Sequence, residues 1–209
     1  MSTKSTISDA YQTFVLEHGS RPASVKVFAD ALNMSEREFY QEFSSFPAIE
    51  QYLFQKMLES AIQKLESSEE FASYGAAEKL AGLFYTWLEE MLQDRSFVVF
   101  AYQQSPHALF TPFYMESAKG VFQEFVKHVI KEGIANNEVA DRLFLPKVYR
   151  GWLWMQAKWL LRFWILDQSP NFEKTDEAVE KVLRLTYDLI RPNSLDSAWD
   201  VTKFLWRNK

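Results

Sequence analysis

The segment Ser35–Phe43 concentrates side chains that are able to contact nucleic-acid bases. It reads SEREFYQEF, so three carboxylates stand against one guanidinium, that of Arg37. Arginine and glutamine donate paired hydrogen bonds to purine edges, and a carboxylate accepts one from the amino group of cytosine. The same carboxylates repel phosphates, whose charge supplies most of the sequence-independent affinity for DNA. The segment therefore combines base-reading chemistry with a charge that opposes DNA binding.

Charge is distributed unevenly along the 209 residues, whose formal net charge is −5. Residues 1–50 hold 4 Lys/Arg and 7 Asp/Glu, whereas residues 147–209 hold 11 and 8. The positive excess thus lies in the C-terminal third and not around the Ser35–Phe43 segment. This distribution counts against tight binding of that segment to DNA.

The elements that position these side chains are predicted to be helices, and we expect an all-α fold. Gly and Pro number 6 and 7 and fall mostly where helices should end. Apolar spacing predicts a first helix over 7–18, with Gly19 at its end. Ser24 and Ser35 are placed to cap the next two helices. Glu38, three positions after Ser35, completes a capping box and so has a structural role.

Longer helices are predicted after this three-helix segment, and Pro47 suits the first turn of the fourth helix. The expected ranges are 47–65, 76–93, 96–104, 112–136, 146–166, 176–190 and 195–207. We expect a helix-turn-helix domain over 1–46 and a larger helical domain over 47–209. The last helix, 195–207, is amphipathic, and it either packs on the protein or makes weak contact with a membrane surface.

The composition argues against several classes of site and location. There is no cysteine, so disulfides and thiolate metal sites are excluded. The three histidines lack carboxylates at ligand spacing, and no Gly-rich phosphate loop is present, so we expect no metal, no cofactor and no enzymatic activity. The N-terminus lacks the apolar core of a signal peptide, and the apolar stretch 148–166 contains three cations, so we expect a cytoplasmic protein.

A set of positions in the first three helices and at the start of the fourth forms a specific pattern. These positions are Ile7, Ala10, Phe14, Gly19, Ser24, Val25, Phe28, Ala29, Asn33, Met34, Ser35, Phe39, Tyr40, Phe43, Ser45, Ala48 and Ile49. The pattern resembles the tetracycline-repressor (TetR) family of bacterial regulators. The resemblance implies a DNA-binding helix-turn-helix, a pocket for a small hydrophobic ligand, and a homodimer formed by the last two long helices.

The resemblance also implies which side chains would contact operator DNA. Arg37, Glu38 and Gln41 would face bases, and the others would face phosphates or cap helices. The full implied set is Ser24, Lys26, Ser35, Arg37, Glu38, Tyr40 and Gln41. Each residue of this set lies in the second or third predicted helix or caps one of them.

Several residues depart from the family pattern, and most of them lower the positive charge of the helix-turn-helix. Glu36 stands where Lys or Arg is usual, Arg37 replaces a glycine, and Glu38 replaces a small polar residue. Phe46 replaces a basic residue, and Lys4 is what remains of a basic N-terminal arm. An alternative therefore stays open, namely a protein of this fold that has lost DNA binding and binds or senses a lipid-like ligand.

The helix expected over 146–166 is apolar around nearly its whole circumference, which predicts burial on several sides. Aromatic residues are enriched at the core of subunit interfaces, so this helix is expected to form one. Together with the following helix, the predicted interface residues are Trp152, Trp159, Phe163, Leu183 and Tyr187.

The aromatic side chains of residues 75–165 supply the apolar lining that a ligand pocket needs. The pocket residues implied by the resemblance are Trp87, Met91, Phe100, His107, Phe110, Phe122, Trp154 and Lys158. Two interpretations apply to Arg150, Lys158 and Arg162. Either they form a solvated edge that pairs with acids such as Glu124 or Glu132, or a cation among them holds the carboxylate of an acyl ligand.

Overall fold

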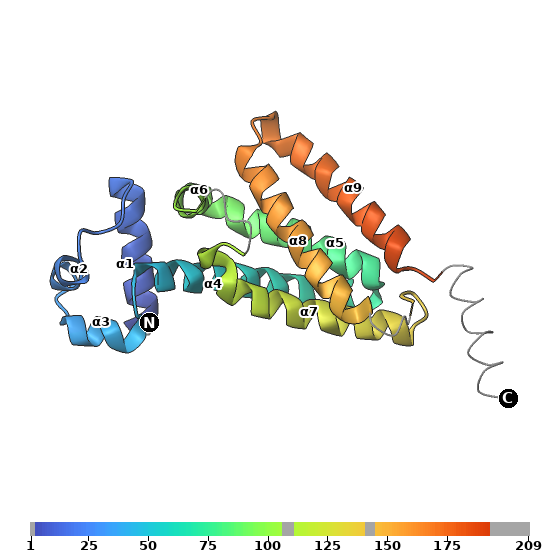
Figure 1. Cartoon of the computed structure of the whole chain (residues 1–209), viewed down its shortest axis with the longest axis horizontal. Helices are drawn as coiled ribbons and strands as arrows, with labels where there is room; N and C mark the ends of the chain where they lie inside the picture. Colours follow the sequence, from blue (N-terminus) through green and yellow to red (C-terminus); the bar gives the residue numbers. More distant parts are fainter. Residues whose placement is uncertain (1–2, 106–110, 141–144, 193–209) are drawn as a thin grey trace. The chain divides into compact units, whose positions relative to one another are not determined.

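The computed structural model describes residues 3–105, 111–140 and 145–192. Within these ranges every regular element is a helix, which confirms the all-α prediction (Figure 1). The predicted pocket residues His107 and Phe110 and the predicted helix over 195–207 lie outside the described residues.

The chain divides into two compact units. The first consists of Met1–Ile62 and Trp87–Val121, and the second of Gln63–Thr86 and Phe122–Lys209. The predicted helix-turn-helix lies in the first unit, and the predicted dimer-forming helices lie in the second.

Three short helices open the first unit, α1 (Thr3–His18), α2 (Val25–Ala31) and α3 (Glu36–Glu42). Helix α1 ends where predicted, because Gly19 adopts a φ of 65° and its N–H donates to the Val15 carbonyl at 2.8 Å. Asn33 has a φ of 54° in the turn between α2 and α3, a conformation that asparagine tolerates better than most residues. These two positions set the directions in which the helices follow one another.

Aromatic rings hold the three helices together. The Phe28 ring meets the rings of Tyr11, Phe39 and Phe46 edge-on, with centroid separations of 6.1, 6.2 and 5.6 Å. Tyr11 stacks on Phe46 at 5.3 Å. Phe46, which replaces a basic residue of the family pattern, thus packs in the core where aromatic pairs add stability beyond their buried area.

Longer helices follow, and most begin within a residue or two of the predicted positions. They are α4 (Phe46–Glu66), α5 (Ala76–Gln93), α6 (Arg95–Gln103) and α7 (Glu116–Ala135), with 3₁₀ turns η1 (Phe71–Ser73) and η2 (Phe113–Met115). The helix predicted over 112–136 is interrupted at its start. Pro112 is extended, with φ −57° and ψ 146°, so a 3₁₀ turn precedes α7.

In the second unit, α8 (Leu145–Leu166) and α9 (Glu173–Ile190) form an antiparallel pair joined by η3 (Pro170–Phe172) (Figure 1). A buried hydrogen bond from Thr186 Oγ1 to Gln156 Oε1, 3.0 Å long, connects the two helices. Helix α9 begins three residues earlier than predicted because the Asp167 carboxylate accepts hydrogen bonds from Thr175 N–H at 3.0 Å and Thr175 Oγ1 at 2.7 Å.

Candidate functional site

Helix α3 presents one buried and one solvent-facing side. The Ser35 hydroxyl accepts from the Glu38 N–H at 3.2 Å, and the Ser35 N–H donates to Glu38 Oε2 at 2.7 Å, so the predicted capping box is present. Phe39 is completely buried, whereas Arg37 and Gln41 are exposed. The cap and the anchoring ring therefore fix the side of α3 that faces solvent.

The predicted DNA-contacting side chains all lie on solvent-exposed positions. The exposed set consists of Ser24, Lys26, Ser35, Arg37, Glu38, Tyr40 and Gln41. Ser24 also caps α2, because its hydroxyl accepts from the Val27 N–H at 3.2 Å. Exposure makes this set accessible to a ligand of any kind, and the charges around it decide which kind fits.

Two lysines of the helix-turn-helix are engaged within the chain. The Lys26 ammonium donates to both carboxylate oxygens of Asp30 at 2.9 and 2.8 Å, and this contact raises the pKa of Lys26. The Lys4 ammonium lies over the rings of Tyr52 and Phe43, 4.8 and 5.3 Å from their centroids. Either lysine would have to give up an existing contact to bind a phosphate.

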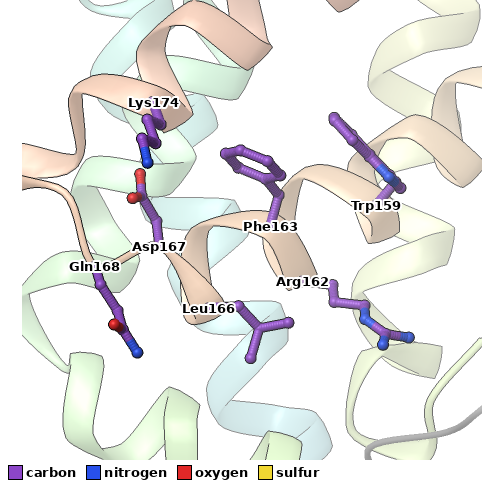
Figure 2. Close-up of a pocket in the computed structure, with 7 residues that line it drawn as sticks. All are labelled: Trp159, Arg162, Phe163, Leu166, Asp167, Gln168 and Lys174. Carbon is purple, nitrogen blue, oxygen red and sulfur yellow. The ribbon is translucent and has the colours of Figure 1, made fainter.

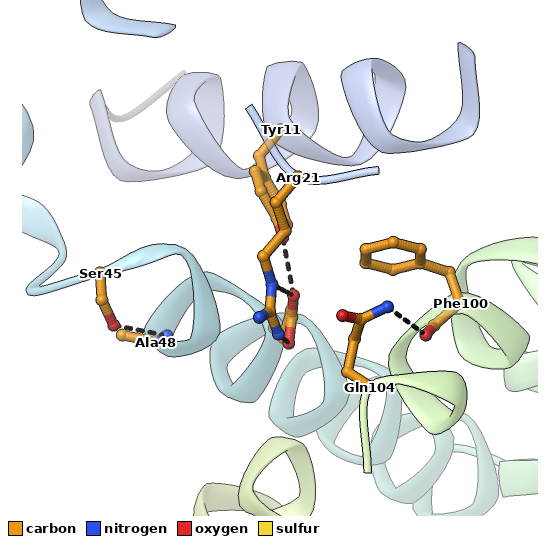
Figure 3. A network of polar contacts seen from close by, with 7 residues as sticks. Tyr11, Arg21, Ser45, Ala48, Phe100 and Gln104 are labelled. Carbon is orange, nitrogen blue, oxygen red and sulfur yellow. Dashed lines mark hydrogen bonds and ion pairs between the residues drawn. The ribbon is translucent and has the colours of Figure 1, made fainter. Parts of the chain in front are cut away.

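A third cation, Arg21, takes part with the Tyr11 hydroxyl in one hydrogen-bond network (Figure 3). Arg21 Nε and Nη2 donate to Glu50 at 2.9 and 2.8 Å, and the Tyr11 hydroxyl donates at 2.7 Å. Only 2% of the Glu50 side chain is exposed. Burial, together with the Glu50 carboxylate, raises the pKa of Tyr11, so the phenol stays protonated as a donor. The network ties α1 and the loop after it to α4.

Arg37 differs from these three cations, since within the described ranges it has no ion pair and no aromatic ring beneath it. Its immediate neighbours Glu36 and Glu38 are exposed and Glu42 is half-buried. Hydrogen bonds from the Ser35 backbone and hydroxyl lower the pKa of Glu38, which is therefore ionised at neutral pH. The accessible face of α3 thus offers a single uncommitted cation beside several carboxylates.

Five of the predicted pocket residues are buried, and they fall into two groups. Trp87, Met91 and Phe100 are buried in the first unit. Phe122 and Trp154 are buried in the second, with ring centroids 5.2 Å apart. Lys158 is half-buried in the second unit and remains a candidate polar anchor.

Each acid proposed to pair with a cation of α8 accepts a hydrogen bond from a lysine outside α8. Glu132 accepts from the buried Lys79 ammonium at 2.6 Å. Glu124 accepts from Lys127 at 2.9 Å, and this bond, followed by the charges of Lys127, His128 and Arg150, lowers the pKa of Glu124. Arg150 therefore contributes to the field around Glu124, as the solvated-edge interpretation expects.

The predicted interface residues are all at least partly exposed. Trp159 and Tyr187 are exposed, and Trp152, Phe163 and Leu183 are half-buried. The structure adds further exposed apolar side chains that the sequence interpretation missed, namely Val148, Met155, Leu166, Leu185 and Leu189. Their signal was the recurrence of apolar residues at helical spacing, seven residues from Val148 to Met155 and four from Leu185 to Leu189, which the abundance of apolar residues on α8 obscured.

A surface hollow of about 480 Å³ lies where α8 runs into the turn before α9. It is lined by Trp159, Arg162, Phe163, Leu166, Asp167, Gln168 and Lys174 (Figure 2). Asp167 is committed to the turn, because it accepts from Ser169 and from Thr175. The rest of the hollow is lined by apolar side chains, by the Gln168 amide and by the cations of Arg162 and Lys174.

Two further classes of site are absent from the described ranges. No group of His, Asp or Glu there is arranged to hold a metal ion. No helix within those ranges is both long and apolar enough to cross a membrane.

Comparison with known proteins identifies relatives of this fold. Residues 79–205 match the family model described as Tetracyclin repressor-like, C-terminal domain. Among curated protein sequences, none matches the chain.

Three solved structures share the fold over most of the chain. FadR of Bacillus subtilis, in complex with stearoyl-CoA, is 15% identical over 86% of this chain and 97% of its own, with a TM-score of 0.61. A TetR/AcrR-family regulator of Thermobifida fusca is 20% identical over 90% and 98%, with a TM-score of 0.54. The ketosteroid regulator KstR2 of Mycobacterium tuberculosis is 18% identical over 92% and 96%, with a TM-score of 0.52.

Proposed function

Because this chain belongs to the tetracycline repressor-like family, whose model matches residues 79–205, we propose that it is a ligand-responsive transcription regulator that binds operator DNA as a homodimer. Residues 1–46 would bind DNA, and residues 47–209 would bind the ligand and dimerise. The observation that carries the proposal is the α3 geometry. Its cap and the buried Phe39 ring leave Arg37 and Gln41 exposed on a rigid helix, as a recognition helix requires.

In this proposal the exposed residues form two groups, one that contacts bases and one that contacts phosphates. Arg37, Glu38 and Gln41 contact base edges, where a guanidinium suits guanine and a carboxylate suits cytosine. Tyr40, Lys26 and Ser24 contact phosphates. Since Lys26 is already paired with Asp30, we expect fewer phosphate contacts and a shallower salt dependence than a basic module would give.

The proposed homodimer uses the exposed apolar face of α8 and α9. Trp159 on α8 and Tyr187 on α9 are large side chains that remain exposed in the single chain. Aromatic and apolar residues of this kind form the cores of subunit interfaces. A two-fold dimer would place two copies of α3 on one DNA duplex, which is how helix-turn-helix proteins read paired half-sites.

The proposed ligand is a small hydrophobic molecule. Four aromatic side chains predicted to line its pocket, Trp87, Phe100, Phe122 and Trp154, are buried, and ligand pockets are lined mainly by such groups. One neighbour by fold was solved with stearoyl-CoA, and another is a ketosteroid regulator. Binding would change operator affinity through linkage between the two sites, with the dimer as the two-state element. We also propose a cytoplasmic location, and weak membrane-surface contact by residues 195–207.

The test is binding of the full chain to the DNA upstream of its own gene, measured by fluorescence anisotropy at several low salt concentrations. We expect saturable binding that Arg37→Ala weakens by about tenfold, since one base contact contributes on the order of 1–3 kcal/mol. Lys131→Ala removes an exposed cation of α7 and serves as the control that leaves binding unchanged. Absence of binding at the lowest salt concentration contradicts the DNA-binding part of the proposal.

A second function is favoured by a specific observation, the commitment of Lys4, Arg21 and Lys26 to contacts within the chain. In this alternative the protein keeps the fold, has lost DNA binding, and binds or senses a lipid-like ligand. It predicts that an apolar molecule co-purifies with the chain. Native mass spectrometry that finds only bare polypeptide, together with no association with lipid vesicles, contradicts this alternative.

A further inference from the structure

The exposed positions of α8 form a single stripe. Between residues 148 and 166 they are Val148, Gly151, Met155, Trp159, Arg162 and Leu166. Val148, Met155 and Trp159 are 56, 54 and 49% exposed although they are large and apolar. The first five positions are separated by three, four, four and three residues, so the stripe is symmetric about Met155.

Side-chain size along this stripe is not symmetric. Gly151 lies four residues before Met155, and a Cβ placed there would meet nothing within 4 Å. Trp159 lies four residues after Met155. Because a helix rises 1.5 Å per residue, the gap left by the missing side chain of Gly151 and the indole of Trp159 lie about 6 Å from Met155 on opposite sides. The α8 surface therefore carries a depression and a projection at equal distances from one point.

A two-fold interface brings this stripe against its own copy in one of two directions. If the two α8 helices run parallel, each position meets itself, so Trp159 faces Trp159 and the Arg162 guanidiniums face each other. If they run antiparallel with Met155 on the axis, Trp159 faces Gly151 and Arg162 faces Val148. The antiparallel arrangement matches large with small and separates like charges, which an isologous interface requires.

We propose that two copies of this chain associate through antiparallel α8 helices that cross at Met155, with each Trp159 indole seated over Gly151 of the second copy. The proposal rests on the homodimer of the proposed function and specifies its register. A tryptophan that fills a gap on the partner surface is the type of contact that contributes most to the binding energy of an interface. A glycine one helical turn from the crossing also allows the two helices to approach closely there.

The hollow at the end of α8 fits the same register. Trp159 and Arg162 line it together with Leu166 (Figure 2). Val148 of the second copy lies opposite Arg162 and so projects toward this hollow. There it covers apolar surface while the aliphatic stem of Arg162 packs along it and the guanidinium remains hydrated.

The experiment exchanges the large and small residues. Dissociation constants are measured by sedimentation equilibrium for the wild-type chain, Gly151→Trp, Trp159→Ala, and the double variant. In Gly151→Trp the new tryptophan collides with Trp159 of the second copy. In Trp159→Ala the gap over Gly151 stays unfilled. We therefore expect each substitution to raise the dissociation constant more than about tenfold. The double variant restores a large–small pair with the roles reversed, and we expect it to dimerise within about tenfold of wild type.

A matched control comes from the other open helical glycine. Gly120 on α7 is also exposed, with nothing within 4 Å of a Cβ, and Gly120→Trp is expected to leave the dimer unchanged. A Gly151→Trp variant that dimerises like wild type, or a double variant no better than either single one, overturns the register while the homodimer stands. A wild-type chain that remains monomeric at high concentration overturns the homodimer itself.

Discussion

At the scale of single residues, Glu50 joins three parts of the first unit. Tyr11 reaches it from α1, Arg21 from the following loop, and Glu50 itself belongs to α4. The carboxylate has three donors within 2.9 Å and almost no solvent contact. Such a group is stabilising only while its partners are present, because an unpaired buried charge is costly.

Glu50→Gln removes the charge and leaves Arg21 without its partner. We expect the free energy of unfolding, measured by urea denaturation of the full chain, to fall by about 1–3 kcal/mol. The value is below that of a fully buried pair because 33% of the Arg21 side chain is exposed. Glu59→Gln is the control, since Glu59 is 41% exposed and lies 3.9 Å from Lys56. Its effect should be under about 0.5 kcal/mol. Equal losses for the two variants would show that burial of Glu50 has no energetic consequence.

The cations of the helix-turn-helix show why residue type alone does not define an electrostatic surface. Residues 1–50 hold 4 Lys/Arg, and three of these are occupied by Asp30, by Glu50 and by the Tyr52 and Phe43 rings. The sequence already indicated a deficit of positive charge. The structure makes the deficit larger, because Arg37 is the cation of this segment that keeps all its donors for a ligand.

At the scale of elements, the turn between α8 and α9 depends on Asp167. Burial raises the pKa of this carboxyl, but hydrogen bonds from Thr175 and Ser169 outweigh it and lower the pKa from 3.8 to about 2. The folded state therefore binds its proton less readily than the unfolded chain. The resulting stabilisation is complete above about pH 4 and is lost as the pH falls toward 2.

Asp167→Asn tests this dependence. At pH 7 we expect the variant to be less stable than wild type by about 1–3 kcal/mol, since charge-assisted hydrogen bonds are lost. The difference should shrink as the pH falls from about 4 to about 2, where wild-type Asp167 becomes protonated. Chemical denaturation at a series of pH values measures it, with Asp176→Asn, an exposed acid in the first turn of α9, as the control. A stability difference that is constant across this range would contradict the role given to the charge.

The short caps were predictable because their signals are local. Ser24 and Ser35 accept from N–H groups three residues ahead, and Gly19 ends α1 through a hydrogen bond four residues back. The start of α9 was not predictable in this way. It follows Asn171 and Phe172, which both have a positive φ, in a turn that Asp167 holds through Ser169 and Thr175, several residues along the chain.

At the scale of the whole molecule, the chain's lack of cysteine provides a direct test of the two-fold axis. If Met155 lies on this axis, a single Met155→Cys substitution brings two thiols together across the interface. We expect most of the chain to form a disulfide-linked dimer under mild oxidation, because the Cα atoms would come within the roughly 4–7 Å that a disulfide spans. Non-reducing electrophoresis measures the fraction.

The control for this measurement is Leu16→Cys, which places a thiol on an exposed position of α1, a helix that takes no part in the proposed interface. It should remain reduced or cross-link only slowly. Equal cross-linking of the two variants would mean that random collision, and not a defined axis, brings the thiols together.

The amino-acid sequence alone predicts the all-α class, the three short helices with their caps, and the deficit of positive charge in the first 50 residues. These properties depend on residue composition and on residues within a few positions of one another. Tertiary packing determines which cations are already engaged and which apolar side chains of α8 stay exposed. Arg21 meets Glu50 across 29 positions, and no local spacing encodes that meeting. Burial of one α8 face, and exposure of the stripe through Met155, likewise depend on which distant helices cover it.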